Sequence, residues 1–255
     1  MMTCSYNNRD SATKPLVSVI IVVRNCEKHL AQTISSVIDQ TYKNIELIII
    51  DGNSTDGTVD LIRKYETSIS NWVSEPDDGI YDAMNKAIKL CKGDYLYFLN
   101  CADYFAHLDT LETAVKYLRH KMPDILHGNI LCVHEDGVQA KSTQINSEYD
   151  LFRETISHQA LFTARHVFNT VGVFDKSYRI CADREWLLRA LKVHKFALTY
   201  IDIPICIFDR SGVSSRQRLQ LRLENLKINL RHFKLQCYPF LFRQLANKVK
   251  STLAF

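Results

Sequence analysis

The chain lacks any hydrophobic run long enough to cross a bilayer, which needs roughly 20 residues. Its longest nearly continuous apolar run covers only residues 17–23. The first ten residues, MMTCSYNNRD, lack the basic and then apolar layout of a secretory signal peptide. With 255 residues, of which 46% are hydrophobic and 24% charged, the composition is that of an ordinary globular protein. We therefore expect a cytoplasmic protein that is neither secreted nor membrane-spanning.

The sequence also lacks any C-x-x-C pair, which a structural zinc site would normally show. The eight cysteines are scattered singly, at Cys4, Cys26, Cys91, Cys101, Cys132, Cys181, Cys206 and Cys237. This spacing argues against a disulfide framework and predicts thiols that stay free in a reducing cytosol.

Apolar runs rich in β-branched residues alternate with segments of helical periodicity over the first hundred residues. The apolar runs predict strands at 15–23, 45–50, 69–74 and 94–99. The periodic segments predict helices at 25–40, from 54–56 to about 66, and at 79–91. Such alternation is typical of an α/β fold, in which crossover helices flank a Rossmann-like, mostly parallel sheet.

Polar residues follow the predicted strands, at 24–25, 51–53, 75–78 and 100–103. Ligands of open parallel sheets bind beyond the carboxyl ends of the strands, so these clusters predict one shared site. Carboxylates gathered there would repel one another unless a cation offset their charge, and a divalent cation on two phosphate oxygens would do so. The alternative is that each acid only caps a helix or forms a turn, where Asp is favoured in any case.

An ordered series of motifs resembles the family 2 glycosyltransferases of the GT-A fold, of the kind that build bacterial surface polysaccharides. The motifs are SVIIVVRNCEKHLAQTISSVIDQTY, IELIIIDGNSTDGT, SEPDDGIYDAMNKAIKLCKGDYLYFLNCADYF, SHQALF, GVFDKSYRICADREWLLR and SGVSS. The resemblance spans residues 16–215, read as one catalytic domain with a nucleotide-binding half (16–105) and an acceptor half (106–215). Residues 1–15 are expected to form a flexible N-terminus, and residues 216–255 a helical tail.

The resemblance implies a nucleotide-sugar site in the first half of the domain. Asp51 would accept a hydrogen bond from the base, most naturally the imide N–H of uracil, and Val23 and Asn25 would line the same pocket. Asp78 would lie by the base and ribose, with Asp77 as the weaker alternative. The remaining donor-binding residues would be Asn85 and Asn100.

The resemblance also implies a metal ion, Mn²⁺ or Mg²⁺. The family's usual acidic motif after the fourth strand reads Asn-Cys-Ala-Asp here, at positions 100–103. Only Asp103 remains of its acids, so Asp103 would be the main protein ligand, and the donor diphosphate would supply further oxygens.

The second half of the domain would carry the chemistry. Asp183 matches the family's general base, which removes the acceptor hydroxyl proton on the face opposite the leaving diphosphate and so produces inversion. Its alternatives are a plain helix N-terminal residue or, as the base, Glu185. His158 and Gln159 stand where the family has a pair near acceptor and diphosphate. Arg189 is expected either to steady Asp183 or lie near phosphate, or else to be a surface residue, and Trp186 is expected in the core.

The tail from residue 216 is basic and amphipathic, with Glu224 as its one acid between residues 219 and 250. Such a segment either contacts an anionic membrane on the cytosolic face, or packs as a solvated helix on the catalytic domain or in a dimer. Nucleic-acid binding is disfavoured because no reading motif accompanies the charge.

Together these features predict inverting transfer of a sugar from a UDP-sugar to a hydroxyl of a polysaccharide or a lipid-linked oligosaccharide. Two alternatives stay open. One is a non-catalytic nucleotide-sugar-binding protein, suggested by the missing acids at Asn100 and Ala102. The other is a sugar nucleotidyltransferase, which would need a glycine-rich loop after the first strand that VVRNCEKHL does not offer.

Overall fold

The structure is a computed structural model that describes residues 14–134, 137–208, 217–234 and 238–239. Most of the expected flexible N-terminus, the SGVSS motif and the end of the basic tail lie outside the described residues.

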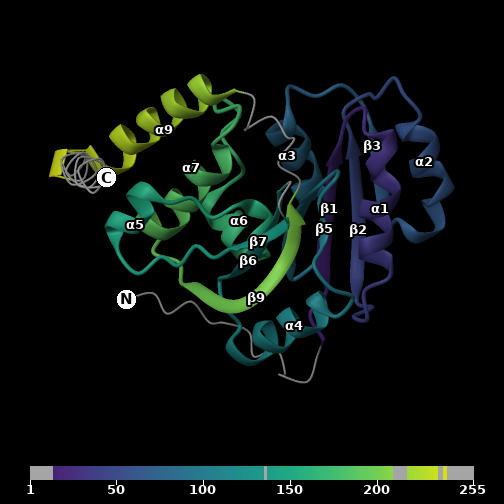
Figure 1. The fold of residues 1–255 in the computed structure, drawn as a ribbon, viewed down its shortest axis with the longest axis horizontal. Helices are drawn as coiled ribbons and strands as arrows, with labels where there is room; N and C mark the ends of the chain where they lie inside the picture. Colours follow the sequence, from purple (N-terminus) through teal and green to yellow (C-terminus); the bar gives the residue numbers. More distant parts are fainter. Residues whose placement is uncertain (1–13, 135–136, 209–216, 235–237, 240–255) are drawn as a thin grey trace.

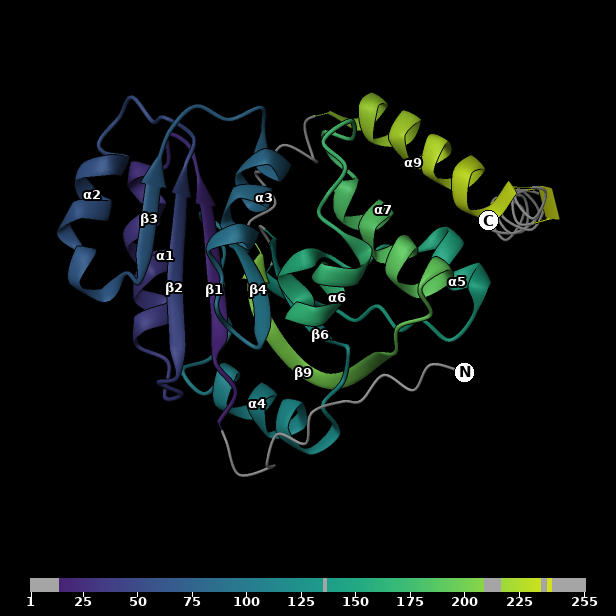
Figure 2. The same ribbon diagram turned by 180° about the vertical axis from the view of Figure 1, so that it is seen from behind.

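The first half of the chain forms the predicted parallel sheet. Its strands are β1 (Val17–Val23), β2 (Ile45–Asp51), β3 (Asn71–Ser74) and β4 (Tyr95–Asn100), in the order β3-β2-β1-β4. The crossover helices are α1 (Glu27–Ile38), α2 (Thr58–Lys64) and α3 (Ile80–Leu90). All seven residues of β1 are buried, as expected for a central strand of a sheet covered on both faces. Helices α1 and α3 cover opposite faces of these strands (Figures 1 and 2).

Helix α2 begins later than its sequence suggested. Its first residue is Thr58, because the oxygen-bearing side chains before it form a turn instead of helix. Asp56 Oδ1 accepts from the Thr58 backbone N–H at 3.0 Å, so the aspartate still supplies an acceptor at the helix start.

The second half of the chain extends the same sheet with strands of mixed direction. The full order is β3-β2-β1-β4-β8-β6-β9-β5, with β7 paired to β6. The added strands are β5 (Tyr104–Phe105), β6 (Ile125–His134), β7 (Gly137–Lys141), β8 (Leu161–Ala164) and β9 (Leu198–Phe208). The helices are α4 (Thr110–Lys121), α5 (Glu148–Arg153), α6 (Arg165–Val171), α7 (Ala182–Leu188) and α9 (Arg218–Phe233). The fold also contains three short helical turns, at Glu66–Ser68, His158–Ala160 and Arg189–Val193.

The pairing of β4 with β8 joins the two halves. These strands are antiparallel, with Tyr95 opposite Ala164 and Tyr97 opposite Phe162. The start of β8 therefore lies beside the end of β4. Topology alone thus brings the turn that precedes β8, at His158–Ala160, to the edge where the predicted donor residues lie.

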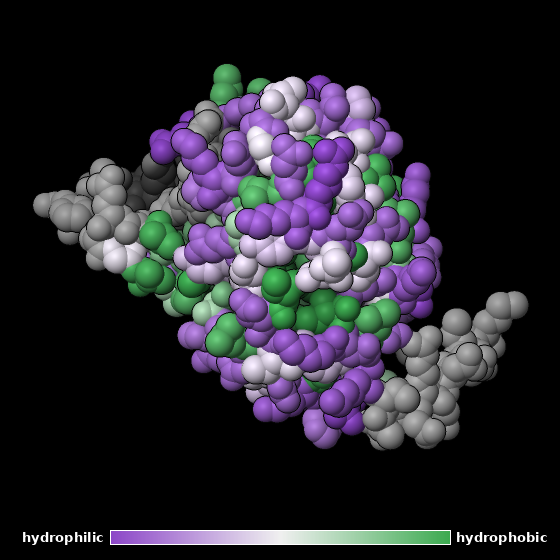
Figure 3. Space-filling view, turned by 90° about the vertical axis from the view of Figure 1, so that its right-hand side faces the viewer, coloured by the Kyte–Doolittle hydropathy of each residue, from purple (hydrophilic) through white to green (hydrophobic). Residues whose placement is uncertain are grey.

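An aromatic cluster fills the core between α6 and α7. Trp186 is 2% exposed and stacks on Phe168, with ring centroids 4.4 Å apart. The expectation that Trp186 belongs to the core is confirmed. The surface beyond α1 and α2 is covered mainly by hydrophilic residues (Figure 3). Within the described residues, no helix has the length and apolar character needed to cross a membrane.

The prediction of free thiols is wrong for two of the cysteines. Cys26 and Cys101 form a disulfide across 75 residues of sequence, with Cα atoms 6.6 Å apart. They come directly before α1 and directly after β4, and the parallel pairing of β1 with β4 brings both segments to the same edge of the sheet. The thiols of Cys91, Cys132, Cys181 and Cys206 are free. Cys4 and Cys237 lie outside the described residues.

Candidate active site

The turn after β2 is organised around Asp51. The Asp51 carboxylate accepts from the Ser54 backbone N–H at 3.0 Å, from the Ser54 hydroxyl, and from the Ser74 hydroxyl at 2.7 Å. Asp51 is fully buried, so its oxygens are closed to a ligand in this conformation. The expected hydrogen bond to a base would require Ser54 or Ser74 to shift.

Val23 and Asn25 lie beside this turn, as expected because the parallel strands β1 and β2 end at the same edge of the sheet. The Val23 carbonyl accepts from the Gly52 N–H at 2.9 Å. Asn25 has a left-handed backbone, with φ of 50°, and its Oδ1 accepts from the Thr55 N–H at 2.8 Å. The loops after β1 and β2 are therefore held together by hydrogen bonds.

The two neighbouring aspartates of the EPDDG segment have different surroundings. A Cβ at Gly52 would clash with Asp77 Oδ2, so the Asp77 carboxylate lies directly against the Asp51–Gly52 turn. Asp78 instead has a side chain 82% exposed, and it pairs with Lys176 at 3.3 Å. Of the two, Asp77, the weaker alternative in the sequence, is the one that lies against the Asp51–Gly52 turn, and Asp78 as the donor contact stays a prediction.

Both polar atoms of the Asn85 side chain form hydrogen bonds with the Phe174 backbone. Its Nδ2 donates to the Phe174 carbonyl and its Oδ1 accepts from the Phe174 N–H, both at 2.9 Å. These contacts tie α3 to the loop before α7, and a role of Asn85 in donor binding stays a prediction. Tyr81, a residue not singled out from sequence, makes the link to the site instead.

Asp183 and Asn100 are bridged by His158. Nδ1 of His158 lies 3.1 Å from Asp183 Oδ2, and Nε2 lies 3.2 Å from Asn100 Oδ1. A neutral imidazole has one donor and one acceptor nitrogen. Both neighbouring atoms are acceptor oxygens, so a neutral ring donates either to Asp183 through Nδ1 or to Asn100 through Nε2, and a doubly protonated ring donates to both. The end of β4 is in this way connected to Asp183 through a single side chain.

The other oxygen of Asp183 faces α3 and the start of its own helix. Oδ1 accepts from the Arg184 backbone N–H at 2.8 Å and lies 3.0 Å from the Tyr81 hydroxyl, which also lies 2.7 Å from the Ile180 carbonyl. Burial, and then the Asp183 charge, raise the pKa of Tyr81 well above its usual value, so the hydroxyl stays a donor. Asp183 is thus fixed in orientation, with its side chain still 13% exposed.

Gln159 and Asp103 form a second contact between the halves. Gln159 Nε2 donates to Asp103 Oδ2 at 2.8 Å, and Asp103 is only 2% exposed. In the described part of the chain, no three His, Cys, Asp or Glu side chains lie close enough to hold a metal ion. A Mn²⁺ or Mg²⁺ ion held here would therefore have Asp103 as its main protein ligand and would need further oxygens from the donor diphosphate, as the resemblance implies.

Glu185 and Arg189 are engaged away from Asp183. Glu185 is fully buried and accepts from Arg189 Nε at 2.8 Å and faces His232 Nε2 at 3.2 Å. The Arg189 guanidinium also donates to the carbonyls of Val171 and Val173. These contacts turn Arg189 and Glu185 towards each other and not towards Asp183, and a phosphate contact by Arg189 stays a prediction.

Glu224 of α9 is a residue whose role the sequence did not reveal. Its carboxylate accepts from the backbone N–H groups of Arg179, Ile180 and Cys181, each at 2.9 Å. Burial would raise the pKa of Glu224, but these bonds and one from Gln220 outweigh it and lower the pKa. The basic tail thereby holds the loop that leads into Asp183.

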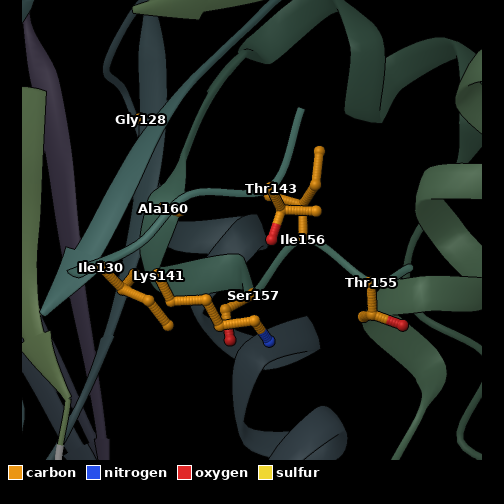
Figure 4. A pocket seen from close by; sticks show the side chains of 8 residues that line it. All are labelled: Gly128, Ile130, Lys141, Thr143, Thr155, Ile156, Ser157 and Ala160. Atoms are coloured by element: carbon orange, nitrogen blue, oxygen red, sulfur yellow. The ribbon is translucent and has the colours of Figure 1, made fainter. Parts of the chain in front are cut away.

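A shallow pocket lies beside the His158–Ala160 turn but does not contain the site. It is lined by Gly128, Ile130, Lys141, Thr143, Thr155, Ile156, Ser157 and Ala160 (Figure 4). None of these is a candidate donor, metal or catalytic residue, so we assign the pocket no role in the reaction.

Solved structures with this fold are found among sugar transferases. TarS of Staphylococcus aureus in complex with UDP-GlcNAc matches with a TM-score of 0.69 and 19% identity, over 85% of this chain and 67% of that one. In another TarS crystal structure the chain spans 40% of the protein. The mannosyltransferase PcManGT of Pyrobaculum calidifontis, in complex with GDP-Man and Mn²⁺, matches with a TM-score of 0.65 and 18% identity, over 90% of this chain and 66% of that one. The fold is therefore that of the GT-A glycosyltransferases.

Sequence relatives give the same assignment. A PGL/p-HBAD biosynthesis glycosyltransferase of Mycobacterium bovis is 27% identical over 206 residues, which are 78% of each chain. An uncharacterized glycosyltransferase of Mycobacterium tuberculosis is 35% identical over 207 residues, covering 80% of this chain and 78% of that protein. The family described as Glycosyl transferase family 2 matches residues 18–181. On a match of this extent, and with these strand-end residues in place, the chain is a glycosyltransferase and belongs to family 2.

Proposed function

We propose that this enzyme transfers a sugar with inversion from a nucleotide-sugar, specifically a UDP-sugar, to a hydroxyl of a polysaccharide or lipid-linked oligosaccharide. The observation that carries the proposal is the hydrogen-bonded series Asn100–His158–Asp183. It joins the end of β4, at the carboxyl edge where ligands of parallel sheets bind, to a carboxylate of the second half.

The proposed chemistry is a direct displacement. Asp183 Oδ2 accepts the proton of the acceptor hydroxyl while that oxygen forms a bond to the anomeric carbon. The bond from this carbon to the diphosphate oxygen breaks, and the nucleoside diphosphate leaves with the electron pair. A base on the face opposite the leaving group inverts the anomeric centre. Tyr81 and His158 hold Asp183 in place, and this proton removal contributes about 10²- to 10⁴-fold to the rate.

For the donor, we propose that Asp77 and the turn around Asp51 contact the nucleoside, with Val23 and Asn25 beside them and Asn100 closer to the sugar. The closeness of Asp77 to Gly52 supports this arrangement. The presence of UDP-GlcNAc in the TarS structure supports a uridine nucleotide.

For the cation, we propose that Mn²⁺ or Mg²⁺ arrives with the donor, whose phosphate oxygens provide most of its ligands, and that Asp103 is its protein contact. The Mn²⁺ in the PcManGT structure supports metal use within the fold. Mn²⁺ should then raise the thermal stabilisation given by a UDP-sugar, because a ligand that binds only the folded state stabilises it by RT ln(1 + [L]/Kd), which grows as Kd falls.

The test compares Asp183→Asn with the parent enzyme. Asparagine keeps one oxygen for Tyr81 and the Arg184 N–H, so the fold should be retained. We expect the rate of UDP release from UDP-sugars, measured with a bacterial lipid-linked glycan fraction as acceptor, to fall about 10²- to 10⁴-fold. The affinity for UDP, from thermal shift, should stay within about twofold, because Asp183 does not bind the nucleotide.

The control is Asp175→Asn, in the same segment but outside the Asp183–His158 contact, where its carboxylate accepts from the Ser177 N–H at 3.0 Å. It should retain nearly full activity. An active Asp183→Asn enzyme would remove the base role. UDP binding without any turnover in the parent would favour the non-catalytic alternative.

A further inference from the structure

Helix α9 exposes a row of four leucines on its outer side. Leu219, Leu223, Leu226 and Leu230 are 72, 58, 49 and 54% exposed. Their spacing of four, three and four residues places them on one face of the helix. Isolated exposed leucines are common on protein surfaces, but a continuous row along three turns marks an interaction surface.

The inner side of the same helix is fixed to the enzyme. Glu224 and Ile228 are buried, and Asn229 Oδ1 accepts from Arg184 at 2.8 Å. Figures 1 and 2 show α9 at the periphery of the molecule, with α7 on one side of it. The leucine row therefore faces outward because the opposite face is already occupied.

Basic side chains border the leucine row on both sides. At about 100° per residue, Arg222 lies along one edge of the row and Lys227 along the other, whereas Arg218 lies further round the helix and Lys234 comes just after its last residue, Phe233. All four are exposed. The one acidic residue of α9, Glu224, lies on the buried face. Every charged side chain on the outer face of α9 is therefore basic.

We propose that this face of α9 binds the surface of a bilayer that contains anionic lipids. The leucines enter the boundary between headgroups and acyl chains, and the arginines and lysines beside them contact the lipid phosphates. A second copy of the chain fits less well. Pairing two such faces would bring basic edges together, and neither copy offers an exposed acid on α9 in return.

This binding would place the acceptor side of the enzyme near the membrane. The loop that Glu224 holds leads directly to Asp183, so the helix that lies on the bilayer also positions the residue proposed as the base. The inference itself does not depend on transfer, because binding is measured without donor or acceptor.

The experiment is sedimentation of the full chain with vesicles. We expect binding to phosphatidylcholine vesicles that contain 30% phosphatidylglycerol, little binding to pure phosphatidylcholine, and weaker binding at high salt. The double variant Leu223→Gln/Leu226→Gln should lower the partition coefficient at least tenfold, and so should Arg222→Glu/Lys234→Glu. Both pairs are exposed, so thermal unfolding should be unchanged.

Matched controls carry the same changes elsewhere. Leu108→Gln alters a leucine that is 62% exposed, and Lys116→Glu/Lys121→Glu reverses two exposed charges on α4. Both should bind as the parent does. Absence of binding by the parent, equal binding to neutral vesicles, or undiminished binding by the α9 variants would each overturn the proposal. A dimer in light scattering that Leu223→Gln/Leu226→Gln dissociates, without vesicle binding, would assign the face to a second copy.

Discussion

Replacement of Glu224 by glutamine should weaken both the fold and the catalytic loop. The carboxylate uses both oxygens: Oε1 accepts from the Arg179 N–H and the Gln220 amide, and Oε2 from the N–H groups of Ile180 and Cys181. Glutamine has only one acceptor oxygen, so in either orientation its NH₂ group faces two donors that lose their partner.

The magnitude follows from those lost bonds. A buried donor left unsatisfied costs about 1–3 kcal/mol, and Gln220 can turn away to water, so we expect a loss of about 2–4 kcal/mol. At about 2–4 °C per kcal/mol, the melting temperature should fall by about 5–15 °C. Displacement of the loop before Asp183 should lower kcat by roughly 10- to 100-fold, since errors of about 1 Å in position cost this much. The affinity for UDP should change little.

The effect should also depend on pH. The folded pKa of Glu224 lies below its usual value of 4.5, so its charge stabilises the fold fully above about pH 4.5. This stabilisation is lost as the pH falls through the lower folded pKa. The difference in urea stability between the parent and Glu224→Gln should therefore be largest near neutral pH and shrink below about pH 4.5.

The control is Glu154→Gln, which removes a carboxylate paired with the exposed Arg153 and should change stability by less than about 1 kcal/mol. If Glu224→Gln had the same melting temperature and the same kcat as the parent, α9 would not hold the loop. A uniform fall in stability with unchanged kcat would show that Glu224 supports the fold without positioning Asp183.

Two further predictions concern the donor side. Asp77→Asn should weaken UDP binding at least tenfold in thermal-shift titrations, whereas Asp78→Asn, which removes only an exposed pairing with Lys176, should leave it within about twofold; the reverse ranking would return the donor contact to Asp78. Reduction of the Cys26–Cys101 disulfide, or its replacement by two serines, should lower urea stability by about 2–4 kcal/mol, because the bond closes a loop across 75 residues; equal stability with and without dithiothreitol would contradict this.

The sequence was sufficient to predict the donor half of the fold. Runs such as residues 45–50 are almost entirely apolar and rich in β-branched residues, and their alternation with periodic helical segments leaves few possible topologies. The second half of the chain, whose strands run in both directions, was not predicted in detail. Strand β8 has only four residues, and its place beside β4 depends on long-range pairing. The motif predicts Asp183 as the base, which stays a prediction, and its link to Asn100 through His158 required the structure.

Some features could not be predicted from the sequence for specific reasons. Asp77 and Asp78 are chemically identical neighbours, so only the path of the backbone decides which one meets Gly52. The Cys26–Cys101 pair was missed because a spacing rule tests cysteines close in sequence, whereas parallel strands bring distant ones together. Glu224 stood out only as an isolated acid in a basic tail. Here that acid accepts from three backbone N–H groups of the loop before Asp183, which the sequence could not show.

The short pairing of β4 with β8 has a consequence for how this enzyme can vary. Only three residue pairs fix the alignment of these strands. A slip by one residue would turn the side chains of β8 to the opposite face and move the preceding turn by about 3.3 Å. His158 would then no longer reach from Asn100 to Asp183. Residues of β4 and β8 therefore set the spacing between the two halves of the proposed catalytic centre, and changes in them should lower the turnover rate more than the affinity for the donor.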